Sequence, residues 1–131
     1  MIHRITIPLP GEPTFNMDLG DGPQDAAIRW YLDRQQLPEP ELIHLLSRAI
    51  RPGDFVVDCG ACTGFFTLLA GALGATVLAV EPGENNLPNL YRNVAANRFS
   101  IDVWPVALGG KAETRDLLII DDGGANSFTQ P

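Results

Sequence analysis

The sequence predicts an α/β fold in which a parallel sheet has helices on both faces. Apolar runs of strand length, residues 55–57, 76–80 and 101–106, alternate with segments of helical periodicity. Such alternation is typical of parallel sheets with right-handed crossovers. In addition, the run 55–57 leads directly into a turn with glycines at both ends, Gly60–Gly64, and then into an apolar helix. A nucleotide-type ligand site begins in this way in open α/β sheets.

Length and charge narrow the class of protein. The 131 residues suit about one domain, and 45% of them are apolar. The chain has 16 acidic and 9 basic residues and a net charge of −7, so we expect neither nucleic acid nor an anionic membrane as a partner. The N-terminus lacks the apolar stretch of a signal peptide, and no apolar run reaches the ~20 residues of a membrane span. We therefore expect a cytoplasmic protein.

Residues 1–40 are predicted to form a β-hairpin and a short helix ahead of the main domain. Apolar side chains alternate before and after a turn at 10–13, rich in proline and glycine, with the second alternation at 15–19. Asp25 is suited to cap the short helix, which ends at Pro38.

The remaining residues, 41–131, are predicted to form the ligand-binding domain. An amphipathic helix is expected at 41–51, before the first strand. The helix after the glycine turn, 65–73, is apolar nearly all round, so it must be covered on more than one side. A further helix begins near Asn85, with Leu87, Leu90, Tyr91 and Val94 as its apolar stripe, and the run 117–120 is expected to form a short strand outside the main sheet.

Two acids accompany the glycine turn. Asp58 ends the first strand, and Glu81 ends the next one, 23 residues further on. Glycines at Gly60 and Gly64 allow a ligand to lie against the backbone. The turn has no G-x-G, and an acid immediately before it would repel a pyrophosphate. Both points favour the sulfonium cofactor S-adenosyl-L-methionine over NAD, with Asp58 facing its cationic end and Glu81 accepting hydrogen bonds from the ribose.

Two other interpretations of the same residues stay open. Aspartate and glycine at a strand–helix junction also occur as turn and cap chemistry alone. Cys59 and Cys62 form a C-x-x-C at a helix start, the position of a thioredoxin-like redox pair, where the helix N-terminus lowers a thiol pKa. His3 and His44 have no partner at ligand spacing, so no metal site is predicted.

Three segments together resemble the FkbM-type S-adenosylmethionine-dependent methyltransferases. They are VVDCGACTGFFTLLA, LAVEPGENNLPNLYRNVAAN and VWPVALGG, and the resemblance covers about residues 51–128. It implies a Rossmann-like class I methyltransferase fold and methyl transfer to a hydroxyl, often on a sugar or a secondary metabolite. It also implies cofactor-binding residues, which by position are Asp58, Gly60, Ala61 and Gly64 at the methionine end, Glu81 and Pro82 at the ribose, and Val106–Ala107 near the adenine.

The sequence departs from this family in two ways. Cys62 stands where the family usually has asparagine, and the sequence given stops at Pro131, ahead of the family's later strands. Those strands carry most of the acceptor site, so no catalytic base is assigned and an incomplete sheet is expected. Without a neighbour on one side, the strand 55–57 exposes a free edge that favours a homo-oligomer. The alternative to a methyltransferase is therefore a non-catalytic binding or interaction module.

Overall fold

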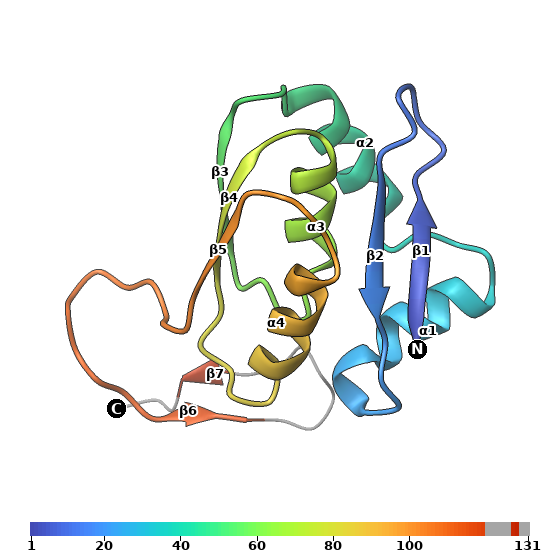
Figure 1. Cartoon of the computed structure of the whole chain (residues 1–131). Coiled ribbons are helices and arrows are strands. Elements are labelled where there is room, and N and C mark those ends of the chain that lie inside the picture. The colour runs from blue at the N-terminus through green and yellow to red at the C-terminus, as the bar shows by residue number, and fades with distance from the viewer. Residues whose placement is uncertain (120–126, 129–131) are drawn as a thin grey trace.

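The described part of the chain is arranged in three layers. A computed structural model describes residues 1–119 and 127–128 (Figure 1). In that view a parallel sheet lies on one side, two helices lie in the middle, and an antiparallel hairpin lies on the other side. The carboxyl ends of the sheet strands point toward the lower edge of the view, where the glycine turn lies.

The parallel sheet has three strands in the order in which they occur along the chain. They are β3 (Phe55–Cys59), β4 (Thr76–Val80) and β5 (Ile101–Trp104). The register pairs Val57 with Leu78, and Leu78 with Asp102. A β-α-β-α-β unit of this order is one half of a Rossmann-type fold. The predicted Rossmann-like parallel sheet is therefore confirmed.

Helices cover only one face of this sheet in the described residues, whereas the sequence predicted both. Helix α3 (Phe65–Ala72) joins β3 to β4, and α4 (Leu87–Ala95) joins β4 to β5. Both crossovers advance in the same direction and with the same hand, so both helices lie on the same face. The opposite face exposes 67% of Phe55, 44% of Val57 and 53% of Trp104.

The hairpin covers the other side of the two helices. It consists of β1 (Ile2–Thr6) and β2 (Thr14–Asp18), which pair antiparallel as predicted. Its inward side chains share one core with α3, formed by the buried residues Ile5, Ile7, Phe15, Met17, Leu19, Ile43, Phe65, Leu68 and Leu69. Helix α3 is thus enclosed between sheet and hairpin, which explains why it is apolar nearly all round. Described residues of both predicted segments, 1–40 and 41–131, contribute to this common core.

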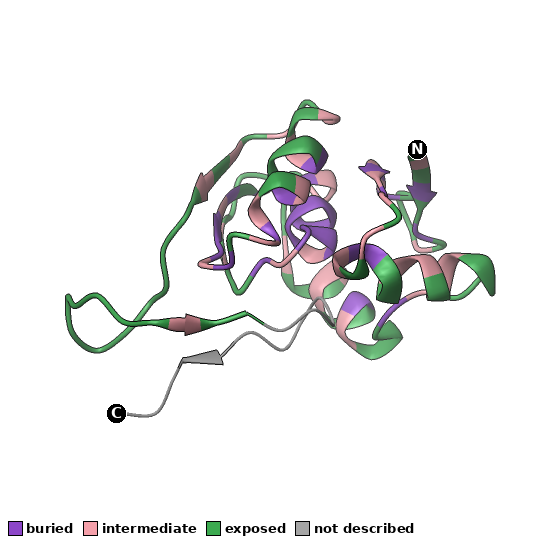
Figure 2. Ribbon diagram, turned by 90° about the horizontal axis from the view of Figure 1, so that it is seen from below, coloured by how far each residue is buried: buried purple, intermediate pink, exposed green. Residues whose placement is uncertain are grey.

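The other elements lie around these layers. A 3-10 turn η1 (Pro23–Asp25) and α1 (Ala26–Asp33) follow the hairpin, and α2 (Pro40–Ala49) precedes β3. Strand β6 (Leu117–Leu118) pairs with β7 (Ser127–Phe128) outside the main sheet, as predicted; Ile120 lies outside the described residues. Figure 2 shows buried positions gathered at the central helices and exposed ones along 105–116. None of the described helices has the length and apolarity that a membrane span requires.

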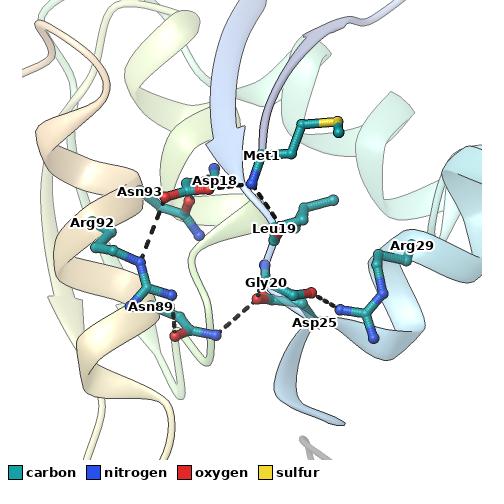
Figure 3. Close-up of polar contacts among 9 residues, drawn as sticks. All are labelled: Met1, Asp18, Leu19, Gly20, Asp25, Arg29, Asn89, Arg92 and Asn93. Carbon is teal, nitrogen blue, oxygen red and sulfur yellow. Dashed lines mark hydrogen bonds and ion pairs between the residues drawn. The ribbon is translucent and has the colours of Figure 1, made fainter. Parts of the chain in front are cut away.

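Polar contacts join the end of the hairpin to α1 and α4 (Figure 3). The fully buried Asp25 takes part in them, because its Oδ2 accepts hydrogen bonds from the Gly20 amide (2.9 Å) and from Nδ2 of Asn89 (2.8 Å). The prediction that the Asp25 side chain caps the short helix is wrong, since α1 has no side-chain cap. Asp25 already has helical backbone angles, with φ −99° and ψ −2°, and its carboxylate instead binds the chain that precedes it.

Candidate functional site

The glycine turn is bonded to the end of the neighbouring strand. The amides of Gly60 and Ala61 donate to the carbonyl of Val80, at 2.8 and 3.1 Å. Gly60 and Gly64 have φ angles of +86° and +100°, which favour glycine. A Cβ on Gly60 would meet nothing within 4 Å, whereas one on Gly64 would lie 2.8 Å from Cδ1 of Leu90. Gly60 therefore leaves room for a ligand, while Gly64 is required by the packing of α3 against α4.

Cys62 also has left-handed backbone, with φ +52°. Its amide donates to Oε2 of Glu81 at 2.8 Å, which holds the turn in this conformation. Asparagine adopts left-handed backbone more readily than other side chains do. Cys62 thus adopts a conformation in which asparagine is more common than cysteine.

The thiol of Cys62 does not have the electrostatic environment of a redox cysteine. Burial raises its pKa, and the negative charges of Glu81, Asp25 and Asp58 act in the same direction. A redox-active pair needs a lowered pKa, because the thiolate is the reactive form. Cys62 thus shows the opposite of the lowered pKa on which the C-x-x-C interpretation depends, and the two cysteines are not joined by a disulfide.

Asp58 lies at the carboxyl end of β3, half-buried beside the turn. Burial raises the pKa of its carboxyl group, and the nearby charge of Glu81 adds to this, while a hydrogen bond from Thr67 opposes it. Oγ1 of Thr67, from the first turns of α3, donates to Oδ2 of Asp58 at 2.5 Å. A carboxylate under these conditions favours a positively charged partner.

Glu81 is buried, with 4% of its surface exposed, and it ties three segments together. Oε2 accepts from the amide of Cys62, and Oε1 accepts from the amide of Gly83 at 2.7 Å and from Nδ2 of Asn86 at 3.2 Å. A carboxylate has about four acceptor positions. Described residues use three of them, two on Oε1 and one on Oε2.

A pocket of about 280 Å³ opens beside the glycine turn; we call it the turn pocket. It brings together four of the predicted site residues, Asp58, Gly60, Ala61 and Gly64. It is also lined by Gln24, Ala27, Ile28, Glu39, Cys62, Thr63, Phe65 and Phe66. None of these twelve residues is basic, and Asp58 and Glu39 are acidic. This composition suits a ligand with a positive charge.

Two other predicted residues, Pro82 and Ala107, lie at a second, larger pocket. This strand-end pocket, of about 700 Å³, is lined by Pro82, Glu84, Pro105, Val106, Ala107 and most of the residues from 108 to 119. Glu81 lines neither pocket; it accepts a hydrogen bond from Cys62 of the turn pocket, and it directly precedes Pro82 of the strand-end pocket in the sequence. The seven predicted residues are thus divided between two pockets and one buried carboxylate.

Sequence reasoning missed the contribution of the N-terminal segment to the turn pocket. Gln24 comes from η1, and Glu39 precedes α2. Neither belongs to a motif, and each reaches the glycine turn only through the packing of residues 1–40 on α3. Among the described residues no group of three histidine, cysteine or acidic side chains is arranged to hold a metal ion.

Comparison with known proteins yields only distant similarity. No family model matches the sequence, and no curated protein does. Three similar solved structures are a candidate rRNA-methylase from Clostridium thermocellum (13% identity, TM-score 0.45), a candidate S-adenosylmethionine-dependent methyltransferase from Listeria monocytogenes (22%, 0.44) and a SAM-dependent methyltransferase from Agrobacterium tumefaciens (21%, 0.42).

These similarities cover different shares of the chains. The matched regions span 52%, 56% and 78% of this chain, in the same order. They span 41%, 35% and 32% of the solved chains, so this chain corresponds to well under half the length of each. The assignment of the fold rests on the sheet order and crossovers described above.

Proposed function

We propose that the turn pocket binds the amino-acid end of S-adenosyl-L-methionine, with Asp58, Gly60, Ala61 and Gly64 as the residues that hold it. The observation that carries this proposal is the combination of a half-buried Asp58 with a pocket that has no basic lining residue. The cofactor's ammonium and sulfonium groups are positive, and they complement such a pocket. The open side of Gly60 supports the fit, because nothing in the protein fills it.

The same residues fit a dinucleotide poorly. A pyrophosphate carries negative charge and binds at backbone amides of a glycine-rich turn, usually with a second glycine where it approaches. Here the corresponding amides of Gly60 and Ala61 are already bonded to Val80, and the carboxylate of Asp58 lies beside them. These contacts favour the sulfonium cofactor over NAD.

The remaining cofactor contacts are proposed for the strand-end pocket. Pro82 and Ala107 line it and are suited to border the ribose and the adenine. In this proposal Oε2 of Glu81, which accepts one hydrogen bond from the Cys62 amide, also accepts one from a ribose hydroxyl. The cofactor, when bound, supplies a methyl group on a positively charged sulfur.

We further propose that the chain is the cofactor-binding half of an FkbM-type methyltransferase that acts on a hydroxyl group of a sugar or a secondary metabolite. The resemblance of three sequence segments supports this assignment. Methyl transfer to a hydroxyl depends on positioning and on a base where the hydroxyl must lose its proton. The described residues supply the positioning of the cofactor, and none of them is assigned as the base.

Cofactor binding is tested by thermal unfolding with added ligand. At about 100 times its dissociation constant, S-adenosylmethionine should stabilise the chain by about 2.7 kcal/mol, and S-adenosylhomocysteine should also stabilise it. A shift with NADH and none with either adenosyl ligand would contradict the proposal.

The variant Asp58→Asn separates binding from folding. Burial raises the pKa of Asp58 in the folded state, so on raising the pH the unfolded chain loses the Asp58 proton before the folded chain does. The free energy of unfolding therefore falls as the pH rises from the unfolded pKa through the folded pKa. Near neutral pH the ligand-free variant should therefore melt higher than the wild type, yet lose the shift with S-adenosylmethionine. Asp102→Asn, at an exposed position of β5, is the matched control and should keep the shift.

The open sheet face favours a second candidate, a non-catalytic interaction module. Strand β3 ends the three-stranded sheet, and the face that carries Phe55, Val57 and Trp104 is exposed. An apolar edge strand is a template for pairing with another chain. In this candidate, a second copy pairs along β3 and covers the same face.

Light scattering tests whether the chain pairs with a second copy through β3. The wild-type chain should be a dimer at micromolar concentration, and Val57→Lys should be a monomer, because a charge on an edge strand opposes pairing. Thr6→Lys, on the hairpin strand β1, serves as the control and should remain dimeric. A monodisperse wild-type monomer would contradict the module.

A further inference from the structure

A second acidic residue faces the turn pocket from outside the glycine motif. Glu39, in the segment between α1 and α2, lines the pocket together with Asp58. The two come from distant parts of the chain, and the packing of the N-terminal segment on α3 brings them to one cavity. Glu39 is exposed, so its carboxylate lies at the rim, while Asp58 is half-buried.

The backbone holds Glu39 in an unfavourable conformation. Its φ of +44° and ψ of +61° are left-handed, which a residue with a side chain rarely adopts. Two of the left-handed non-glycine residues in the described chain, Glu39 and Cys62, line the turn pocket. Residues kept in such conformations are often found at ligand sites, where the surrounding structure holds them for function.

The position of Glu39 is also well anchored. Its carbonyl accepts the first hydrogen bonds of α2, from the amides of Leu42 (2.9 Å) and Ile43 (3.1 Å). Prolines on both sides, Pro38 and Pro40, restrict the backbone further. The backbone that carries the Glu39 carboxylate is thus held in place by α2 and by the two prolines.

The electrostatics of the pocket point to the charge of that ligand. The carboxylates of Glu81, Asp25 and Asp58 all act on the thiol of Cys62, a lining residue, and no lining residue is basic. A second carboxylate at the rim increases the negative potential further.

We propose that Glu39 and Asp58 together bind the ammonium group of the cofactor's amino-acid end. This inference rests on the proposed binding of S-adenosylmethionine and assigns a further contact within it. An ammonium group has three N–H donors, so it can bond two carboxylates at once, whereas a sulfonium has none. Glu39 therefore selects ligands that carry an amino-acid end.

The test compares Glu39→Gln with Glu41→Gln by titration calorimetry, using three adenosyl ligands. Glu41 is exposed in the first turn of the same α2 helix and does not line the turn pocket, so it is a matched control for loss of charge. Glu39→Gln should raise the dissociation constants of S-adenosylmethionine and S-adenosylhomocysteine about tenfold or more. It should leave the dissociation constant of 5′-methylthioadenosine unchanged, because this ligand lacks the amino-acid end. Glu41→Gln should change none of the three dissociation constants.

A second variant separates binding from backbone strain. Glycine adopts the left-handed conformation without strain, so Glu39→Gly should raise the melting temperature of the free protein. It should also lower the affinity for S-adenosylmethionine as much as Glu39→Gln does. Unchanged affinity in both variants would overturn the inference, as would an equal loss of affinity for 5′-methylthioadenosine. A wild-type chain that binds no S-adenosylmethionine would overturn the proposed function and this inference together, whereas wild-type binding with unchanged variants would overturn this inference alone.

Discussion

Replacing Glu81 with alanine will lower the free energy of unfolding by about 3–5 kcal/mol, even without a ligand. The carboxylate is buried and accepts from the amides of Cys62 and Gly83 and from the side chain of Asn86. Its removal leaves three donors without their acceptor and releases the left-handed turn at Cys62. Urea denaturation followed by circular dichroism measures the change.

Two further variants test whether the loss of stability in Glu81→Ala comes from the hydrogen bonds of its carboxylate. Glu84→Ala, at an exposed position three residues later, should change the free energy of unfolding by less than about 0.5 kcal/mol. Glu81→Gln should be intermediate, because one oxygen remains but the amide nitrogen faces donors. A loss below about 1 kcal/mol for Glu81→Ala would contradict the bracing role of the carboxylate. Glu81→Ala alone cannot test the ribose contact, since loss of fold also abolishes binding.

Local patterns predicted the parallel strands, the glycine turn and the position of Glu81 at the end of β4. The hydrogen bond from Cys62 to Glu81 joins residues 19 apart and depends on the register of β3 and β4. No spacing rule contains that register. The sequence therefore predicted which carboxylate matters, and its internal hydrogen bonds emerged only from the structure.

Polar contacts between α4 and the hairpin explain why the buried side of α4 differs from its predicted apolar stripe. The periodicity of α4 places Tyr91 on its apolar stripe, yet 47% of Tyr91 is exposed and Asn93 is fully buried. Helix α4 meets the edge of β2, whose amides need acceptors, and Asn93 and Asn97 supply them to Asp18 and Asn16. A hydrophobicity pattern assumes an apolar neighbour, whereas a strand edge requires hydrogen bonds.

Replacing Asn93 with alanine is expected to lower the free energy of unfolding by about 2–4 kcal/mol. Oδ1 of Asn93 accepts from the amide of Asp18 at 2.6 Å, and Nδ2 donates to the carbonyl of Thr63 at 2.7 Å. One buried side chain therefore connects the hairpin to the glycine turn. Figure 3 shows Asn93 beside Asp18 of the hairpin. Its loss leaves an amide and a carbonyl unpaired. Urea denaturation gives the magnitude, and faster hydrogen exchange at the Asp18 amide locates it.

The matched control for Asn93→Ala is Tyr91→Ala, two positions earlier on the same helix and exposed. The structure predicts a large loss for Asn93 and a small one for Tyr91, whereas the hydrophobic pattern predicts the reverse. Asn93→Asp divides the effect further, because the ionised carboxylate still accepts from the Asp18 amide but has no hydrogen to donate to the Thr63 carbonyl. Since Thr63 lines the turn pocket, this variant should keep protection at Asp18 and lose affinity for S-adenosylmethionine. Equal losses for Tyr91→Ala and Asn93→Ala would contradict the bridge between hairpin and turn.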